Sequence, residues 1–189
     1  MCGAELRTEH AHLIELRGRR LLCACDACAL LFSNRTGARY KRVPRDVRLL
    51  TNFHMTDAEW DGLLIPINLA FFFQNSLSER VSAFYPSPAG ATESLLPLET
   101  WASIAEANPV MATMEADVEA LLVNRVGSAR EVSPAEYYIA PIDACYELVG
   151  LIRLHWKGLS GGSEVWKEIG EFFADLRAKA KVLGEATRA

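Results

Sequence analysis

Residues 21–32 read LLCACDACALLF and place three cysteines, Cys23, Cys25 and Cys28, between two apolar runs. In a reducing cytoplasm, clustered cysteines hold a metal or take part in catalysis more often than they form disulfides. Structural zinc takes four ligands in a tetrahedron, and cysteine pairs separated by two to four residues are a usual source of them. Cys25 and Cys28 have that spacing, so this stretch predicts a metal site.

A small zinc-finger fold follows from the sequence around this pair. Cys2 lies near the N-terminal end, and Gly3 after it suits the tight backbone turn of a zinc knuckle. Residues 12–22, HLIELRGRRLL, predict two short strands with Gly18 in the turn between them. A knuckle, a hairpin and a cysteine pair that opens a short helix follow one another in the same order as in a treble-clef zinc finger.

Several residues are candidates for the fourth ligand. Cys23 lies two positions before Cys25, and residues two apart on a strand face the same side. His10 and His12 form an H-x-H pair just before the hairpin. A third alternative is that the chain starts upstream, because an intact treble clef begins with C-x2-C and its first cysteine would fall ahead of Met1. The predicted metal ligands are Cys2, Cys23, Cys25, Cys28, His10 and His12.

Zinc is the metal that this donor set favours, because thiolate sites in cytosolic modules are most often structural zinc sites. An iron–sulfur cluster also fits the spacing. A redox C-x2-C would need a thioredoxin-like βαβ unit, which the sequence lacks. The fifth cysteine, Cys145, falls on an apolar helical stripe and is expected in the core. No catalytic residues are predicted, and the site favours a non-catalytic metal-binding accessory protein. The alternative is an iron–sulfur or redox factor in cofactor assembly, and a weaker one is a zinc-finger regulator that binds nucleic acid.

Charge divides the chain of 189 residues. The net charge is −4, yet residues 1–50 carry ten Lys and Arg against five Asp and Glu. This asymmetry predicts a metal-binding module at 1–34, a basic connector at 35–50 and an acidic body at 51–189. The connector could bind nucleic acid. However, the protein as a whole is acidic and shows no recognition-helix pattern, which favours a solvated face or docking against acidic groups.

The body is expected to have an α+β fold of about four strands and three to four helices. Thr56 and Glu59 form a capping-box pattern at a helix start. Asp143 could cap a later helix, and Ser163 another. The expected strands are 67–74, 80–86, 118–125 and 136–143, of which 118–125 could equally be helical, and 87–94 is expected to be a loop. The expected helices are the one after Thr56, residues 98–107, and the two after Asp143 and Ser163.

No segment predicts membrane insertion or export. The longest apolar run, near residues 68–74, is too short to span a bilayer. The N-terminal residues carry early charges and lack the apolar core of a signal peptide. The expected location is therefore the cytoplasm.

Four stretches together resemble an uncharacterised, actinobacterial-type family, a domain of unknown function. They are CGAEL…EHAHLIEL…RRLLCACDACALLF, AFYPSPAGATESLLPLETW, DVEALLVNR and YYIAPIDACYELVGLIRLHWKGLSGGSEVW. The family's N-terminal motif resembles C-x2-C-G, H-x-H and L-C-x-C-x2-C, and the chain departs from it at the leading cysteine. Members of this family are often encoded beside the genes of uptake [NiFe]-hydrogenases. The resemblance implies an accessory role, with hydrogenase subunits or maturation proteins as partners.

Overall fold

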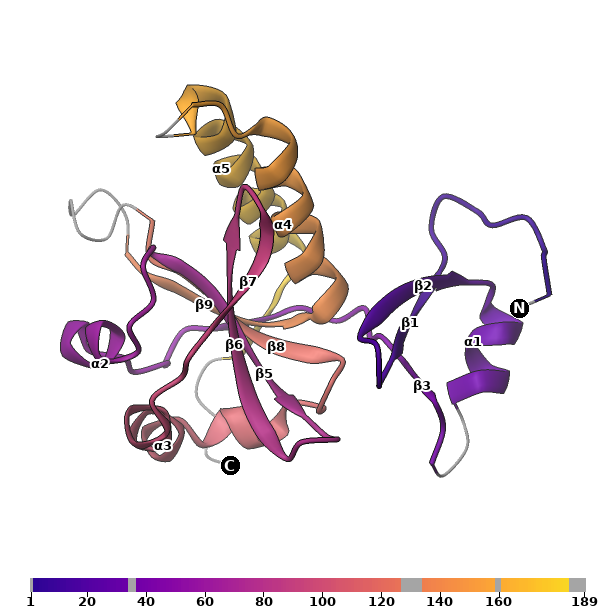
Figure 1. The fold of residues 1–189 in the computed structure, drawn as a ribbon, viewed down its shortest axis with the longest axis horizontal. Helices are drawn as coiled ribbons and strands as arrows, with labels where there is room; N and C mark the ends of the chain where they lie inside the picture. Colours follow the sequence, from indigo (N-terminus) through magenta and orange to yellow (C-terminus); the bar gives the residue numbers. More distant parts are fainter. Residues whose placement is uncertain (1, 34–36, 127–133, 159–160, 184–189) are drawn as a thin grey trace.

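The protein has a mixed α+β fold in the computed structural model, which describes residues 2–33, 37–126, 134–158 and 161–183 (Figure 1). A small N-terminal module, residues 2–33 and 37–42, lies beside a larger body that begins at residue 43. The body is built on one long sheet that has helices on both faces.

The N-terminal module is a three-stranded antiparallel sheet with one helix packed on it. Its elements are β1 (Ala11–Glu15), β2 (Arg20–Ala24), α1 (Asp26–Ser33) and β3 (Tyr40–Arg42), and the strand order is β2-β1-β3. Leu13 of β1 is buried against Cys28 and Ala29 of α1. The predicted hairpin is confirmed, because Leu13 pairs with Leu22 across it.

The hairpin turn differs from the prediction in how it uses glycine. The left-handed backbone conformation falls on Arg19, whose φ is 52°, and not on Gly18. Gly18 is needed for space, because a Cβ atom there would lie 2.8 Å from Oε2 of Glu15. That carboxylate is buried and accepts hydrogen bonds from Arg20 and Arg39, so it has little freedom to move aside.

The body sheet has seven strands among the described residues, so the prediction of about four is wrong. Their order is β10-β4-β9-β8-β5-β6-β7, antiparallel except for the pairing of β10 with β4. The strands are β4 (Arg48–Leu50), β5 (Leu69–Asn75), β6 (Arg80–Ser87), β7 (Gly90–Ser94), β8 (Glu119–Asn124), β9 (Glu136–Pro141) and β10 (Lys181–Leu183). The four strands expected from the sequence are β5, β6, β8 and β9. Residues 87–94, expected as a loop, instead contain β7.

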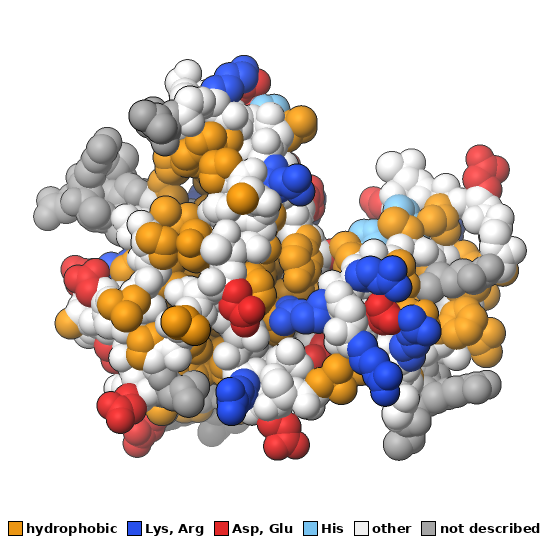
Figure 2. Space-filling model, viewed as in Figure 1, with side chains coloured by type: hydrophobic (Ala, Val, Ile, Leu, Met, Phe, Trp, Pro, Cys, Tyr) orange, Lys and Arg blue, Asp and Glu red, His pale blue; other side chains and the backbone are white. Residues whose placement is uncertain are grey.

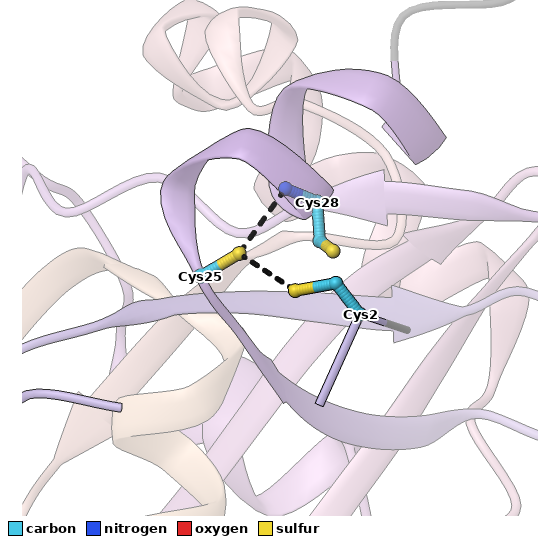
Figure 3. Close-up of side chains that lie close together, drawn as sticks. All are labelled: Cys2, Cys25 and Cys28. Atoms are coloured by element: carbon cyan, nitrogen blue, oxygen red, sulfur yellow. Dashed lines mark hydrogen bonds between the residues drawn. The ribbon is translucent and has the colours of Figure 1, made fainter. Parts of the chain in front are cut away.

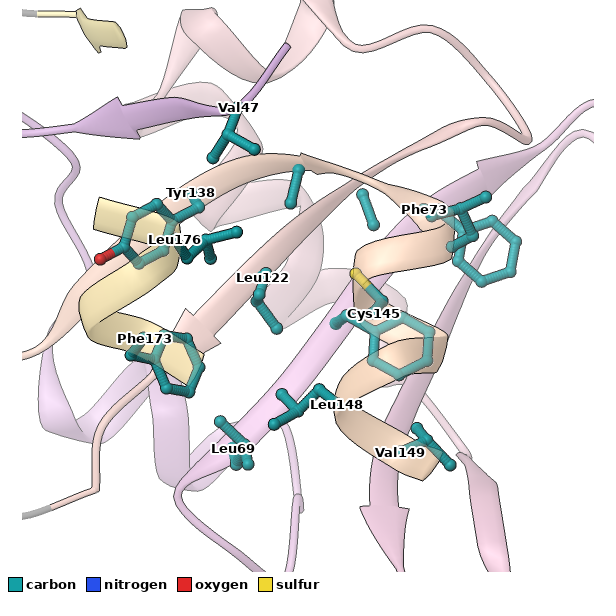
Figure 4. Packing of buried hydrophobic residues seen from close by; sticks show 14 of the residues in the cluster. Val47, Leu69, Phe73, Leu122, Tyr138, Cys145, Leu148, Val149, Phe173 and Leu176 are labelled. Atoms are coloured by element: carbon teal, nitrogen blue, oxygen red, sulfur yellow. The ribbon is translucent and has the colours of Figure 1, made fainter. Parts of the chain in front are cut away.

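Helices cover both faces of this sheet, which explains the uninterrupted apolar runs in its central strands. They are α2 (Asp57–Gly62), α3 (Leu98–Ala107), a 3-10 helix η1 (Pro109–Thr113), α4 (Ile142–His155) and α5 (Gly162–Lys179). In β5, Phe72 packs with the side of α2 and α3, while Phe71 and Phe73 pack with the side of α4 and α5. Cys145 is fully buried in the latter core, as predicted (Figure 4).

The helix starts agree only in part with the sequence. Thr56 caps α2, and the reciprocal contact from Glu59 confirms the predicted capping box. Asp143 and Ser163 are not caps: α4 begins after Pro141 and α5 after Gly161, and neither helix has a side-chain cap. None of the helices in the described residues combines the length and apolar character that a membrane crossing needs.

The basic segment 35–50 contributes β3 to the small sheet and β4 to the large one. Four of its cations form ion pairs within the fold: Arg39, Lys41, Arg42 and Arg48. Lys41 Nζ lies 2.7 Å from Asp117 Oδ2, and Arg48 Nη2 lies 2.8 Å from Glu119 Oε2, so both reach acids of the body. Figure 2 shows Lys and Arg side chains gathered on the module and on the part of the body beside it.

The module packs directly against the body. Ile14 of β1 belongs to the same buried cluster as the residues under α4 and α5. The guanidinium of Arg19 stacks over the ring of Phe73, 3.9 Å from its centroid. His12 Nδ1 lies 2.6 Å from Oδ2 of Asp143, at the start of α4. One face of the small sheet thus carries α1 and the other faces the body.

Candidate metal centre

Three of the predicted ligands converge at one end of the module, as Figure 3 shows. Cys2 comes from the N-terminal segment, Cys25 from the junction of β2 and α1, and Cys28 from the first turn of α1. Their sulfur atoms all lie within 4.8 Å of one another. The Sγ atoms of Cys2 and Cys25 are 3.6 Å apart, and all five cysteines are free thiols.

These distances suit a shared ion. Four sulfur atoms at about 2.3 Å from a central zinc would lie about 3.8 Å from one another. A disulfide would instead need about 2.05 Å between two sulfurs. The backbone N–H of Cys28 also donates to Sγ of Cys25 at 3.5 Å, which holds that sulfur beside the first turn of α1.

Local structure explains how the chain brings these sulfurs together. The β2 strand ends at Ala24, and the carbonyl of Cys25 accepts from the amide of Ala29, so the chain turns into α1 at Cys25. Gly3 has a φ of 73°, a left-handed conformation that lets the N-terminal segment turn beside Cys2. Cys28 is buried against the small sheet, whereas Cys2 is exposed to solvent.

Neighbouring groups shift the ionisation of two of these thiols, Cys2 and Cys28. The pKa of Cys2 is lowered by a hydrogen bond from the backbone of Ala4 and by those from Cys28 and Cys25. The pKa of Cys28 is raised: the backbone amide of Cys2 acts to lower it, but the hydrogen bond to the Cys2 side chain, burial and the Cys2 charge outweigh that effect. A divalent cation among the sulfurs would remove this mutual opposition and favour thiolates at each position.

The other predicted ligands lie elsewhere. Cys23 is exposed and groups with His10 and His12, with one ligand atom of each residue within 4.8 Å of the others. Cys23 is the cross-strand partner of His12 in the hairpin. Cys23 does not join the Cys25 sulfur in this group, and the β2 strand ends between the two residues. The six residues therefore form two groups of three.

Asp143 has a different role from the one that the sequence predicts. Asp143 was expected to cap a helix, but its carboxylate contacts His12, which is 131 positions away along the chain. Only the docking of the module on the body brings the two together. No spacing in the sequence signals that contact.

The three sulfurs can bind a metal. A bound metal would tie together residues from separate segments of the chain.

Searches of curated proteins and of solved structures gave no match. One family profile matches residues 1–180 and is described as a family of unknown function, DUF5947. The chain therefore belongs to the DUF5947 family.

Proposed function

We propose that this protein is a non-catalytic, zinc-binding accessory protein that acts by binding another protein. The observation that carries the proposal is the convergence of the Cys2, Cys25 and Cys28 sulfurs at distances suited to one ion. Zinc is the metal that best fits a set of thiolate ligands in a structural site, and such a site is colourless. Among the described residues three sulfurs meet, so a water molecule or another donor supplies the fourth position.

The role of the metal is to hold the module in shape. Its own core is small, with Leu13, Cys28 and Ala29 among the few buried apolar side chains between sheet and helix. A core of this size contributes little stability, and bound metal supplies folding free energy in such modules. Zinc would fix α1 to the N-terminal segment and to the end of β2.

Helix α1 offers the surface through which a partner would be bound. Leu30, Leu31 and Phe32 are 53%, 57% and 37% exposed, which places three large apolar side chains in water on one short helix. Exposed apolar clusters of this kind mark protein contacts. Because Cys28 lies on the same helix, the metal would set the position of this surface.

The choice of partner rests on the family resemblance. Relatives encoded beside uptake [NiFe]-hydrogenase genes point to a hydrogenase subunit or a maturation protein. The ion pairs of Lys41 and Arg48 with acids of the body give the basic segment a role inside the fold, which weighs against a nucleic-acid regulator.

Metal content and partner binding can be measured on matched variants. Purified protein should hold about one zinc per chain, and Cys25→Ser and Cys28→Ser should lose it. Cys23→Ser, an exposed cysteine outside the sulfur group, is the control and should keep it. Iron together with a visible absorption band would show that the site is an iron–sulfur centre and not a zinc site. Wild-type protein without any metal would reject the proposal.

Partner binding is tested by purifying each variant from the native host. Hydrogenase subunits, identified by mass spectrometry, should co-purify with wild-type protein. They should also co-purify with the control variant Leu95→Glu, whose position is a side chain that is 94% exposed. They should not co-purify with the double variant Leu30→Glu/Leu31→Glu, although that protein should still hold zinc. Equal recovery with both variants would exclude α1 as the docking surface.

A further inference from the structure

The second group of predicted ligands has the features of a separate site. His10, His12 and Cys23 each offer one ligand atom, and these atoms lie within 4.8 Å of one another. The two imidazole rings meet edge to face, with centroids 4.9 Å apart. His12 lies on β1 and Cys23 on β2, His10 directly precedes β1, and the group shares no residue with the sulfur group of Cys2, Cys25 and Cys28.

Both histidines are oriented in the way that metal ligands usually are. His10 Nδ1 lies 2.9 Å from the backbone carbonyl of Arg7, and His12 Nδ1 lies 2.6 Å from Oδ2 of Asp143. A proton on each Nδ1 satisfies these acceptors and leaves the Nε2 lone pair for a cation. Second-layer carbonyl and carboxylate groups fix the tautomer and ring orientation of metal-bound histidines in this manner.

One of these nitrogens lacks any other use among the described residues. Nε2 of His10 is buried and has no hydrogen-bond partner there. A buried polar atom without a partner is unfavourable and calls for an explanation. A cation coordinated by this nitrogen would supply the missing interaction.

The surroundings favour a cation. His10 and His12 line a groove of about 850 Å³ between the module and the α4–α5 side of the body. In Figure 2, histidine side chains lie on the part of the module that faces the body across a hollow. The groove is lined by six carboxylates, against only Arg45 and Lys179 as basic residues in its lining. The acids are Glu9, Asp143, Glu147, Glu168, Glu171 and Asp175. Clefts with one dominant sign of charge concentrate ions of the opposite sign.

We propose that His10, His12 and Cys23 form a second metal site, which binds an exchangeable divalent first-row transition-metal cation. Two imidazoles and one thiolate suit zinc, cobalt, nickel or copper. Three protein ligands leave a coordination position for water or for a small ligand in the groove, as in open zinc sites. The His12–Asp143 contact joins the site to the body, so cation binding and docking of the module support each other. This site goes beyond the proposed function and does not depend on it.

Cobalt is the probe, because a thiolate bound to Co²⁺ gives a near-ultraviolet charge-transfer band. Wild-type protein that holds one equivalent of zinc is titrated with Co²⁺ and should bind one further equivalent with that band. Cys23→Ser should lose the band, and His10→Gln or His12→Gln should weaken Co²⁺ binding. His54→Gln, a histidine outside the group, is the matched control and should bind as wild type does.

A second-layer variant separates coordination from simple structural contact. Asp143→Asn keeps the three ligands and should lower Co²⁺ affinity by about 10- to 100-fold. No bound cobalt, or a band and affinity unchanged in Cys23→Ser and both histidine variants, would overturn the proposal. Loss of zinc from Cys28→Ser with intact cobalt binding would show that the two sites are independent. Cobalt binding at this group in a protein without zinc would reject only the proposed function.

Discussion

At the scale of single residues, Glu15 shows how the module uses a buried charge. Its carboxylate is almost fully covered and accepts hydrogen bonds from Arg39 and Arg20. The hydrogen bond from Arg39 has the largest effect and that from Arg20 the next, and together they hold the pKa of Glu15 below its ordinary value of 4.5. Because ionised Glu15 is stabilised by folding, its contribution is complete above pH 4.5 and is lost as the pH falls through the folded-state pKa.

Glu15→Gln should therefore flatten the acid side of the stability profile. The variant should be less stable than wild type at pH 7, and the difference should shrink below pH 4.5, where Glu15 of the unfolded chain becomes protonated. Urea unfolding of both proteins at several pH values measures this. Glu5→Gln, an exposed carboxylate in the same module, is the control. A constant difference between Glu15→Gln and wild type across the acid range would show that the ion pairs contribute nothing through ionisation.

At the scale of elements, β5 is an inner strand of the body sheet, and its first five residues are buried. Phe72 is fully buried and stacks on Trp101 of α3, with ring centroids 4.9 Å apart. Phe71 and Phe73 point to the opposite core and stack with Phe84. The strand therefore contributes side chains to the cores on both faces of the sheet, as β8 and β9 also do.

Phe72→Ala should lower the free energy of unfolding by about 3–5 kcal/mol, because it removes a large buried ring and leaves a cavity. Leu95→Ala, at a side chain that is 94% exposed, should change it by less than about 0.5 kcal/mol. Chemical denaturation followed by fluorescence measures both. A small effect of Phe72→Ala would mean that α3 does not pack on the sheet as described.

The sequence predicted the elements with strong patterns and missed the weak ones. Long apolar runs predicted β5 and β8, and the pattern at Thr56 predicted the capping box of α2. The β7 strand was missed because its residues are small and polar and it lies at the edge of the sheet, paired only with β6. Strands β4 and β10 have three residues each, too few to show alternation. Their pairing depends on the tertiary fold.

The candidate site was predicted in its residues but not in its grouping. Spacing alone identified Cys25 and Cys28, and their convergence with Cys2 agrees with that prediction. Spacing could not show that Cys23 belongs with the histidines, because this depends on the register of β1 with β2. The contact of His12 with Asp143 depends on how the module docks, which no local pattern contains.

At the scale of the whole molecule, the protein consists of a small module and a three-layered body joined by apolar packing and ion pairs. Ile14 enters the core of the body, and Lys41 reaches Asp117. The sulfur group and α1 lie on the face of the small sheet that does not contact the body. A metal there would thus organise a surface that remains open to a partner.

The most direct test of the account is X-ray absorption at the zinc edge on protein that holds one equivalent of zinc. The account predicts three sulfur neighbours at about 2.3 Å and one lighter neighbour at about 2.0–2.1 Å. Cys28→Ser should lose this spectrum, while Cys23→Ser should keep it. A first shell of nitrogen and oxygen alone, or a sulfur shell that survives the loss of Cys28, would contradict the claim that Cys2, Cys25 and Cys28 hold the ion.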